Sequence, residues 1–281
     1  MGAVGRIARA ASRLLLPEQE RERLARVSVH DAGHGFDPFG MHPEWVRLAR
    51  ALTQPLYRAY FRVQSHGAEH LPQDGPAILI ANHAGTLPFD GAMICADVLS
   101  HTDPPRMPRP VADFFVRSLP FAGVMLSRAG VVNGARGNVR ALLEAGELVL
   151  IFPEGLPAIG KPFSERYKLR ELRVGHVELA LESCAPVIPV AVIGSEEQWP
   201  QLARIERIKP FGAPYLPIVA TPVPLPVRYH IHYGAPIDLA ARFGRGQASR
   251  ETVVEATRIT SGALQELIDR GLTERKGIFF G

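Results

Sequence analysis

The sequence predicts an α/β fold in which a mostly parallel or mixed central sheet is flanked by helices and preceded by N-terminal amphipathic helices. Three observations support this prediction. From about residue 66, short apolar runs alternate with helical segments of about 10–15 residues, which is typical of strands joined by covering helices. Before residue 66, apolar residues recur at helical spacing. The 281 residues, 46% of them hydrophobic, suffice for one large domain with extensions or two small domains.

The first 30 residues are basic, with six arginines against three glutamates. Within them Ile7, Ala11, Leu14 and Leu15 lie on one face of a helix, with arginines on the other side. This pattern fits a basic amphipathic helix lying on an anionic lipid surface. A solvated helix packed on the domain also fits it.

A loop rich in Gly, Pro, His and Asp follows over residues 31–43, and a second amphipathic stretch runs over 44–63. Its aromatic side chains suit either a membrane interface or the protein core. The sequence therefore predicts two parts. Residues 1–65 form N-terminal helices and a loop, with membrane docking as one role, and residues 66–281 form the α/β domain.

The strands and helices of that domain are predicted from its apolar runs and from the glycine, proline and polar residues between them. We expect strands at 77–81, 109–113, 148–152, 187–193 and 227–233, and helices at 88–99, towards Arg128, at 136–145, 174–184 and 249–270. Gly146 ends one of these helices. Six prolines between residues 210 and 226 exclude a regular helix and a central strand there, so this segment fits an extended lid or an apolar surface facing lipid.

The two cysteines, Cys95 and Cys184, each lie inside an apolar segment. Two such residues form neither a disulfide framework nor a metal-ligand cluster, which favours a reducing compartment. We predict that both are buried small side chains rather than nucleophiles. The ten histidines show no recurrent ligand spacing, so no metal site is predicted.

No run of about eighteen apolar residues is present, and the N-terminus lacks a secretory signal. The expected location is the cytosol or, as a peripheral protein, the cytoplasmic face of a membrane. A pI near 9.3 is compatible with nucleic-acid binding, but the central domain lacks a basic stripe interleaved with aromatic residues. We therefore expect no nucleic-acid partner.

We expect the catalytic residues just after the apolar runs, because crevices open at the ends of strands in such sheets. Asn82-His83 follows the run at 77–81, and Asp90 lies shortly beyond it. An imidazole accepts a proton from a hydroxyl when a carboxylate fixes its tautomer. Thr86 as helix N-cap and Pro88 in the first turn would place Asp90 near the positive end of a helix. The alternative is a helix-start loop with a capping acid.

A second strand end carries Phe152-Pro153-Glu154-Gly155. A turn of this kind places a carboxylate and backbone N–H groups in the crevice, where they could hold a substrate hydroxyl or the oxyanion of an acyl transfer. A tight turn with a solvated glutamate is the alternative.

Together these residues resemble the glycerophospholipid acyltransferase (lysophospholipid acyltransferase) superfamily. Asn82-His83 with Asp90 resembles its first motif, and residues 152–155 match its third. Residues 120–132, with Gly123, Arg128 and Gly130, resemble the second motif, and residues 187–190 resemble the fourth. The order and spacing agree over roughly residues 66–235.

The resemblance implies an O-acyltransferase that moves a fatty acyl group from acyl-CoA or acyl-carrier protein to a hydroxyl of a glycerolipid-type acceptor such as a lysophospholipid. It implies His83 as general base, Asp90 as the residue that orients it, and Arg128 as a phosphate ligand. It also implies that Glu154 and Gly155 help to hold the acceptor. The resemblance implies no metal and no cofactor beyond the thioester co-substrate. It does imply that the protein associates peripherally with a membrane.

The chain departs from the family pattern in two places. Six residues separate His83 from Asp90, whereas the family usually has four. After Gly155 the family commonly has a small residue and a phosphate-binding arginine, whereas this chain has residues 156–161, ending in Lys161. Substitutes for that arginine are four nearby basic residues, namely Lys161, Arg166, Lys168 and Arg170. We take Lys161 as the candidate, with a solvated loop as the alternative.

Two further readings of the function stay open. An acyltransferase for neutral glycerides or alcohols would need no phosphate ligand. A non-catalytic acyl-CoA or lipid-binding protein of the same fold would not need His83 and Asp90, and both are present.

Overall fold

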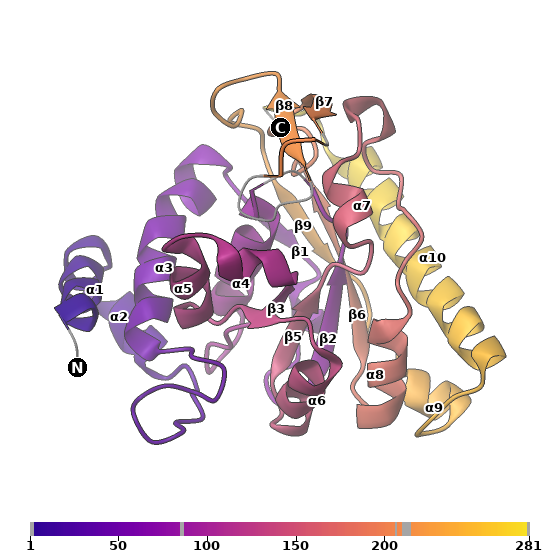
Figure 1. The fold of residues 1–281 in the computed structure, drawn as a ribbon, viewed down its shortest axis with the longest axis horizontal. Helices are drawn as coiled ribbons and strands as arrows, with labels where there is room; N and C mark the ends of the chain where they lie inside the picture. Colours follow the sequence, from indigo (N-terminus) through magenta and orange to yellow (C-terminus); the bar gives the residue numbers. More distant parts are fainter. Residues whose placement is uncertain (1–2, 85–86, 206, 210–214, 280–281) are drawn as a thin grey trace.

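A seven-stranded sheet forms the centre of the protein in the computed structural model, which describes residues 3–84, 87–205, 207–209 and 215–279 (Figure 1). The strands are β1 (Gln64–His66), β2 (Ala77–Ala81), β3 (Arg109–Ala112), β4 (Val132–Asn133), β5 (Leu148–Ile151), β6 (Val187–Ile193) and β9 (His230–Tyr233). Their order is β1-β9-β6-β2-β5-β3-β4, and all neighbours are parallel except β6 and β9. The predicted mostly parallel or mixed sheet is confirmed.

Helices cover both faces of this sheet (Figure 1). The α-helices are α1 (Ala3–Leu15), α2 (Glu18–Ala25), α3 (Pro43–Pro55), α4 (Phe89–His101), α5 (Ala122–Arg128), α6 (Arg136–Glu144), α7 (Leu156–Ile159), α8 (Gly175–Ser183), α9 (Leu239–Phe243) and α10 (Arg250–Glu274). Short π- or 3₁₀-helical turns are η1 (Leu56–Tyr60), η2 (Ala68–His70), η3 (Phe114–Ser118) and η4 (Phe163–Glu165).

The central strands are buried on both faces, which is why they read as continuous apolar runs. Every residue of β2 and β6 is buried. Alternate residues face opposite layers: Leu79 shares a core with α3 and α4, whereas Ile78 and Ile80 pack with α6 and α8. The β6 residue Ile193 packs against α10.

The N-terminal helices share the core of the sheet. Leu16, Leu24, Val46 and Phe61 belong to the same buried cluster as Leu79. The predicted division at residue 65 stays a prediction, but side chains on both sides of it pack together and β1 straddles it.

The structure corrects the prediction for Cys184 and shows how exposed Leu14, Leu15 and Cys95 are. Leu14 and Leu15 are exposed, whereas Ala8 and Leu16 on the neighbouring face are buried. Cys184 is exposed in a left-handed conformation after α8, so the prediction that it is buried was wrong, because helix α8 ends one residue earlier. Cys95 is buried, and burial raises the pKa of its thiol to about 12, as expected for a small core side chain.

Five strands were not predicted or begin at a different residue. Strands β1 and β4 are too short to give a pattern, and β9 begins at His230 rather than at 227. Strands β7 (Gln201–Ile205) and β8 (Leu216–Val219) form a separate antiparallel pair, so the proline-rich segment supplies no central strand, as predicted. Residues 210–214 lie outside the described residues. Within the described part of the chain, no helix is long and apolar enough to cross a bilayer.

Candidate active site

The carboxyl end of β2 opens into the site, and Asn82 fixes the backbone there. Its side-chain oxygen accepts from the N–H of Val192, 2.8 Å away, and its amide donates to the carbonyl of Val192 at 3.2 Å. This paired contact ties the end of β2 to the end of β6. The next residue, His83, therefore leaves the sheet in a fixed direction.

His83 is held by Asp90, the second residue of α4. The His83 Nδ1 lies 2.7 Å from Asp90 Oδ2, which also accepts from the N–H of Ala84 at 2.9 Å. Asp90 Oδ1 accepts from Gly91 N–H at 2.7 Å, and the whole carboxylate is buried. An ionised carboxylate so bonded near the positive end of a helix requires Nδ1 to carry a proton, which leaves Nε2 as the acceptor.

The charge state of His83 follows from two opposed effects. Burial disfavours the charged ring, but the Asp90 carboxylate, aided by Glu154, outweighs burial and raises the pKa of His83 above its usual value. The ring of Phe152 stacks on the imidazole, with centroids 4.3 Å apart. The side chain of His83 keeps 14% of its surface exposed and lines a cavity, so it is oriented, basic and accessible.

The longer loop between His83 and Asp90 does not separate them. Helix α4 begins at Phe89, and Pro88 is its N-cap with no side-chain hydrogen bond. Pro88 therefore precedes the helix instead of occupying its first turn. Gly85 and Thr86 lie outside the described residues, and with them the predicted threonine cap.

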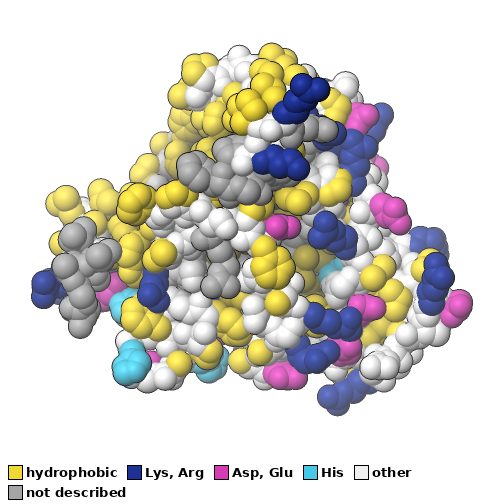
Figure 2. Space-filling view, viewed as in Figure 1, with side chains coloured by type: hydrophobic (Ala, Val, Ile, Leu, Met, Phe, Trp, Pro, Cys, Tyr) yellow, Lys and Arg dark blue, Asp and Glu magenta, His cyan; other side chains and the backbone are white. Residues whose placement is uncertain are grey.

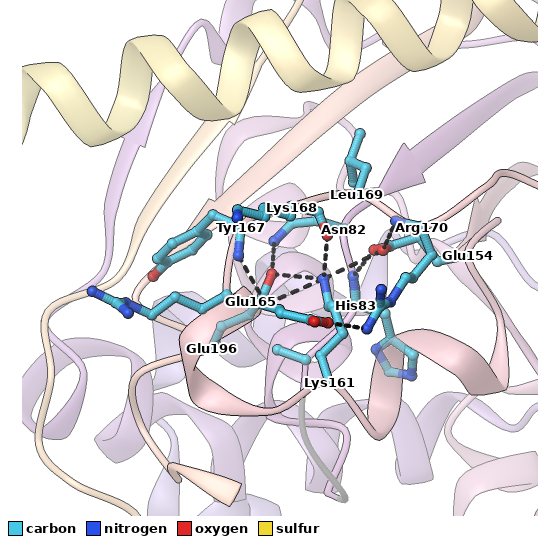
Figure 3. Close-up of polar contacts among 12 residues, drawn as sticks. Asn82, His83, Glu154, Lys161, Glu165, Tyr167, Lys168, Leu169, Arg170 and Glu196 are labelled. Atoms are coloured by element: carbon cyan, nitrogen blue, oxygen red, sulfur yellow. Dashed lines mark hydrogen bonds and ion pairs between the residues drawn. The ribbon is translucent and has the colours of Figure 1, made fainter.

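Behind His83 lies a buried network of charged side chains (Figure 3). Glu154 accepts from the N–H of His83 at 3.1 Å and from the N–H of Arg170 at 2.7 Å. Lys161 Nζ lies 3.3 Å from Glu154 and 3.2 Å from Glu196, and only 3% of its side chain is exposed. Glu154 and Lys161 thus hold the backbone of His83 in this structure, and neither lines the cavity.

Glu196 completes this network. Burial raises its pKa, and Lys161 acts in the opposite direction. Its carboxylate accepts from the N–H of Tyr167 at 3.0 Å and from the Asn82 amide at 3.4 Å. Sequence reasoning missed Glu196, although it follows the end of strand β6 as His83 follows β2, so the same strand-end rule would have found it.

Gly155 makes the turn after β5 possible. Its φ is +63°, which favours glycine, and a Cβ there would meet the Arg173 guanidinium at 2.9 Å. Its own N–H donates to the carbonyl of Phe152 at 3.0 Å, so that group is committed to the turn. The closely packed Arg173 lines the cavity, and the described residues offer its guanidinium no hydrogen-bond or ion-pair partner. Sequence analysis did not single out Arg173, which lies eighteen residues after the turn and approaches it only in the fold.

Arg128 is not brought to this site. Its guanidinium donates to the carbonyl of Gly40 at 3.1 Å and lies 4.0 Å from the centroid of the Phe36 ring. These contacts hold the end of α5 against the N-terminal loop. Arg128 lines a second cavity and is absent from the lining of the cavity that contains His83.

The cavity at His83 has a volume of about 590 Å³ and mainly apolar walls. One wall is a face of α4 with small side chains, formed by Gly91, Ala92, Cys95 and Ala96 and ending at Leu99. This face extends about 12 Å along the helix. The volume of the cavity lies within the usual range for sites that enclose a small, mainly apolar ligand.

Comparisons with known proteins identify relatives of this chain. The family model described as Acyltransferase matches residues 62–193. An uncharacterized protein of Mycobacterium tuberculosis is 36% identical over 259 residues, which are 88% of this chain and 72% of that protein. The human DGAT1/2-independent enzyme synthesizing storage lipids is 29% identical over 210 residues, 73% of this chain and 60% of that enzyme.

A solved structure has the same fold. The 1-acyl-sn-glycerophosphate (LPA) acyltransferase PlsC from Thermotoga maritima superposes with a TM-score of 0.58 over 83% of each chain, at 17% sequence identity. At this identity the likeness concerns the arrangement of sheet and helices.

Proposed function

Since the chain belongs to the acyltransferase family, within the glycerophospholipid acyltransferase superfamily, we propose that it moves a fatty acyl group from an acyl thioester to a hydroxyl of a glycerolipid-type acceptor. The observation that carries this proposal is the 2.7 Å contact between His83 and Asp90 at the wall of an apolar cavity. A non-catalytic lipid-binding protein has no need of an oriented base at that place.

In the proposed reaction, Nε2 of His83 takes the proton of the acceptor hydroxyl while the oxygen attacks the thioester carbonyl. The resulting tetrahedral oxyanion collapses, the C–S bond breaks, and His83 returns its proton to the leaving thiolate. Asp90 stays ionised and stabilises the imidazolium formed between these steps. The acyl chain lies along the small-residue face of α4, which leaves room for it between the helix and the sheet.

The experiment that tests the chemistry measures release of CoA from a long-chain acyl-CoA in the presence of a lysolipid or glyceride. We expect His83→Ala to lower kcat/KM by roughly 10²–10⁴-fold, the usual contribution of a general base. His101→Ala is a matched control, because His101 also pairs with an aspartate, Asp97, at the far end of α4. A folded His83→Ala protein with wild-type activity would overturn the mechanism.

The acceptor is proposed to carry a phosphate, and Arg173 supports this. Its guanidinium packs over Gly155, in the turn that follows β5. It has no acidic partner among the described residues. An arginine held there can bind a phosphate with two hydrogen bonds, replacing the arginine that the motif lacks. The name of the Thermotoga maritima enzyme, a 1-acyl-sn-glycerophosphate acyltransferase, agrees with such an acceptor.

A neutral glyceride is the second candidate. Residues 156–161 lack the motif's arginine, and the human relative is named for the synthesis of storage lipids. Arg173→Ala distinguishes the two acceptors. For a phosphorylated acceptor KM should rise about tenfold or more, since charged hydrogen bonds contribute about 1.5–3 kcal/mol. Arg136→Ala is the control, because Arg136 also lines the cavity but is paired with Glu178 and Glu182. An unchanged KM in Arg173→Ala would favour the neutral acceptor.

Membrane docking is proposed through α1 and its surroundings. Leu14 is 86% exposed and Leu15 is also exposed, with the exposed arginines Arg6 and Arg13 on the same helix. Hydrophobic side chains gather over α1, at the left of the molecule, as well as around β7 and β8 (Figure 2). An apolar surface flanked by basic residues is suited to anionic lipid.

This proposal is tested by flotation with anionic vesicles. Replacing both leucines by serine should lower the partition coefficient about tenfold or more, because burying a leucine contributes about 1.5–3 kcal/mol. Val254→Ser, which changes an exposed apolar residue on α10, serves as the control. An unchanged partition would count against α1 as the lipid contact.

A further inference from the structure

Three histidines that are far apart in the sequence meet on one face of the sheet, away from the catalytic residues. His66 lies on β1, and His230 and His232 lie two residues apart on β9. In the parallel pairing of these strands, His66 is the register partner of His232. All three rings therefore project from the same face, the one that α10 covers. His83 lies beyond the end of β2, in the α4 layer.

The ring nitrogens converge. One nitrogen from each histidine lies within 4.8 Å of the others, and His66 Nε2 lies 3.4 Å from His230 Nδ1, within hydrogen-bond distance. In a tetrahedral zinc site with Zn–N bonds of about 2.0–2.1 Å, two ligand nitrogens are about 3.3–3.4 Å apart. One pair already has this spacing. The rings of His66 and His232 are stacked, with centroids 4.3 Å apart, so binding of one ion requires the third ring to turn about its side-chain bonds.

His232 adds an independent observation. Only 3% of its side chain is exposed, and its buried Nε2 has no hydrogen-bond partner among the residues that the structure describes. A buried polar nitrogen without a partner is costly, so such groups usually have a ligand, a water or a functional role. The α10 helix approaches closely here, because Gly271 has no side chain. A Cβ at that position would lie 2.9 Å from the His232 Nε2.

A carboxylate lies beside the other nitrogen of His232. Glu274, the last residue of α10, lies 3.8 Å from His232 Nδ1 through its Oε2 and is more than half exposed. We propose that the three imidazoles bind a divalent transition-metal ion, Zn²⁺, with His232 as a ligand through Nε2 and Glu274 as the carboxylate that orients its ring. Nitrogen donors select such ions over Mg²⁺ and Ca²⁺, which prefer oxygen.

The sequence analysis predicted no metal site because spacing along the chain was its only criterion. His66 and His230 are 164 residues apart and become neighbours only when β1 pairs with β9.

The bound ion has a structural consequence. It joins edge strand β1 to strand β9 beneath the end of α10, so it fixes the edge of the sheet. The site contains none of the residues proposed for acyl transfer, so it stands or falls independently of that activity.

The test is a zinc titration of the full-length protein after dialysis against a chelator, followed by isothermal titration calorimetry at pH 7.5. We expect about one Zn²⁺ per chain. His66→Gln and His230→Gln should each weaken binding by at least about tenfold, the scale on which even supporting groups around a metal act. The exposed surface histidine His34 supplies the control, since His34→Gln should bind as the wild type does. His83→Ala should also retain binding, which separates this site from the catalytic one.

A second measurement does not depend on the variants. Zinc at about a hundred times its dissociation constant should raise the unfolding temperature of the wild type by roughly 5 °C or more. Substitution with Co²⁺ should give the visible absorption of a tetrahedral complex, and His66→Gln should abolish it. The proposal is overturned if the wild type binds no zinc, or if His66→Gln and His230→Gln bind it with wild-type affinity. If His230→Gln does not fold, the His66→Gln result decides.

Discussion

Two groups of histidines in this protein show that buried imidazoles can have pKa values shifted in opposite directions. His83, at the end of β2, has a carboxylate 2.7 Å away, and the pKa of its ring is raised. Beneath α10, the carboxylate recorded beside His232 among the described residues, Glu274, is farther away at 3.8 Å, and burial lowers the pKa of His230 and His232. The same desolvation acts in both places. At His83 the Asp90 carboxylate, aided by Glu154, outweighs burial and raises the pKa.

This difference matches what each place is proposed to do. A general base in acyl transfer has to accept a proton and hold it until the thiolate leaves, so a raised pKa is useful. A metal ligand needs a ring nitrogen whose lone pair is free, and His232 Nε2 has no hydrogen-bond partner among the described residues. The partner of each ring therefore indicates its chemistry better than its degree of burial does.

The largest expected effect comes from removing the partner of His83. In Asp90→Asn the amide can donate to Nδ1, which favours the tautomer with the proton on Nε2 and leaves no base facing the substrate. We expect kcat/KM to fall roughly 10²–10⁴-fold. The measurement is acyl-CoA turnover together with circular dichroism, which shows whether the variant folds. Wild-type activity in folded Asp90→Asn would show that the carboxylate does not orient the base.

A smaller effect, on the stability of the fold, is expected when the buried cation behind His83 is removed. In Lys161→Met two buried carboxylates, Glu154 and Glu196, lose their shared cation. Breaking a buried ion pair usually costs about 3–5 kcal/mol, so the free energy of unfolding in urea should fall by about that amount. Lys168→Met, at an exposed lysine nearby, should change it by less than about 0.5 kcal/mol. Equal stability of the two variants would mean that the network does not depend on Lys161.

The sequence predicted much of the catalytic region, because its signals are local. Buried strands gave continuous apolar runs, and the polar residues His83 and Glu154 directly follow two of them. The contact between His83 and Asp90 also lies within one short segment, so a strand-end rule and a helix-start rule were enough to find it.

The rest depends on the three-dimensional arrangement. Arg173 reaches Gly155 only through a loop, Glu196 joins the network from the end of β6, and the histidine cluster needs β1 to pair with β9. Arg128 shows the converse case: its motif resembles that of the family, but the N-terminal loop supplies a carbonyl and an aromatic ring that hold its side chain elsewhere. Partners that come from other parts of the chain leave no mark in local sequence.

The smallest expected effect is on the pH dependence of turnover, which compares the two groups of histidines directly. The neutral form of His83 is the active one, and its folded-state pKa lies above the usual 6.5, so kcat/KM should fall about tenfold per pH unit below that raised pKa. His230 and His232 do not titrate in this range, because their pKa values are about 4. In Asp90→Asn burial is no longer outweighed, so the acidic limb of the residual activity should move to lower pH. Rate profiles of both proteins in the presence of a chelator measure this. An acidic limb that stays in place would show that a group other than His83 controls the rate, whereas the expected shift would make His83 behave as the histidines beneath α10 do.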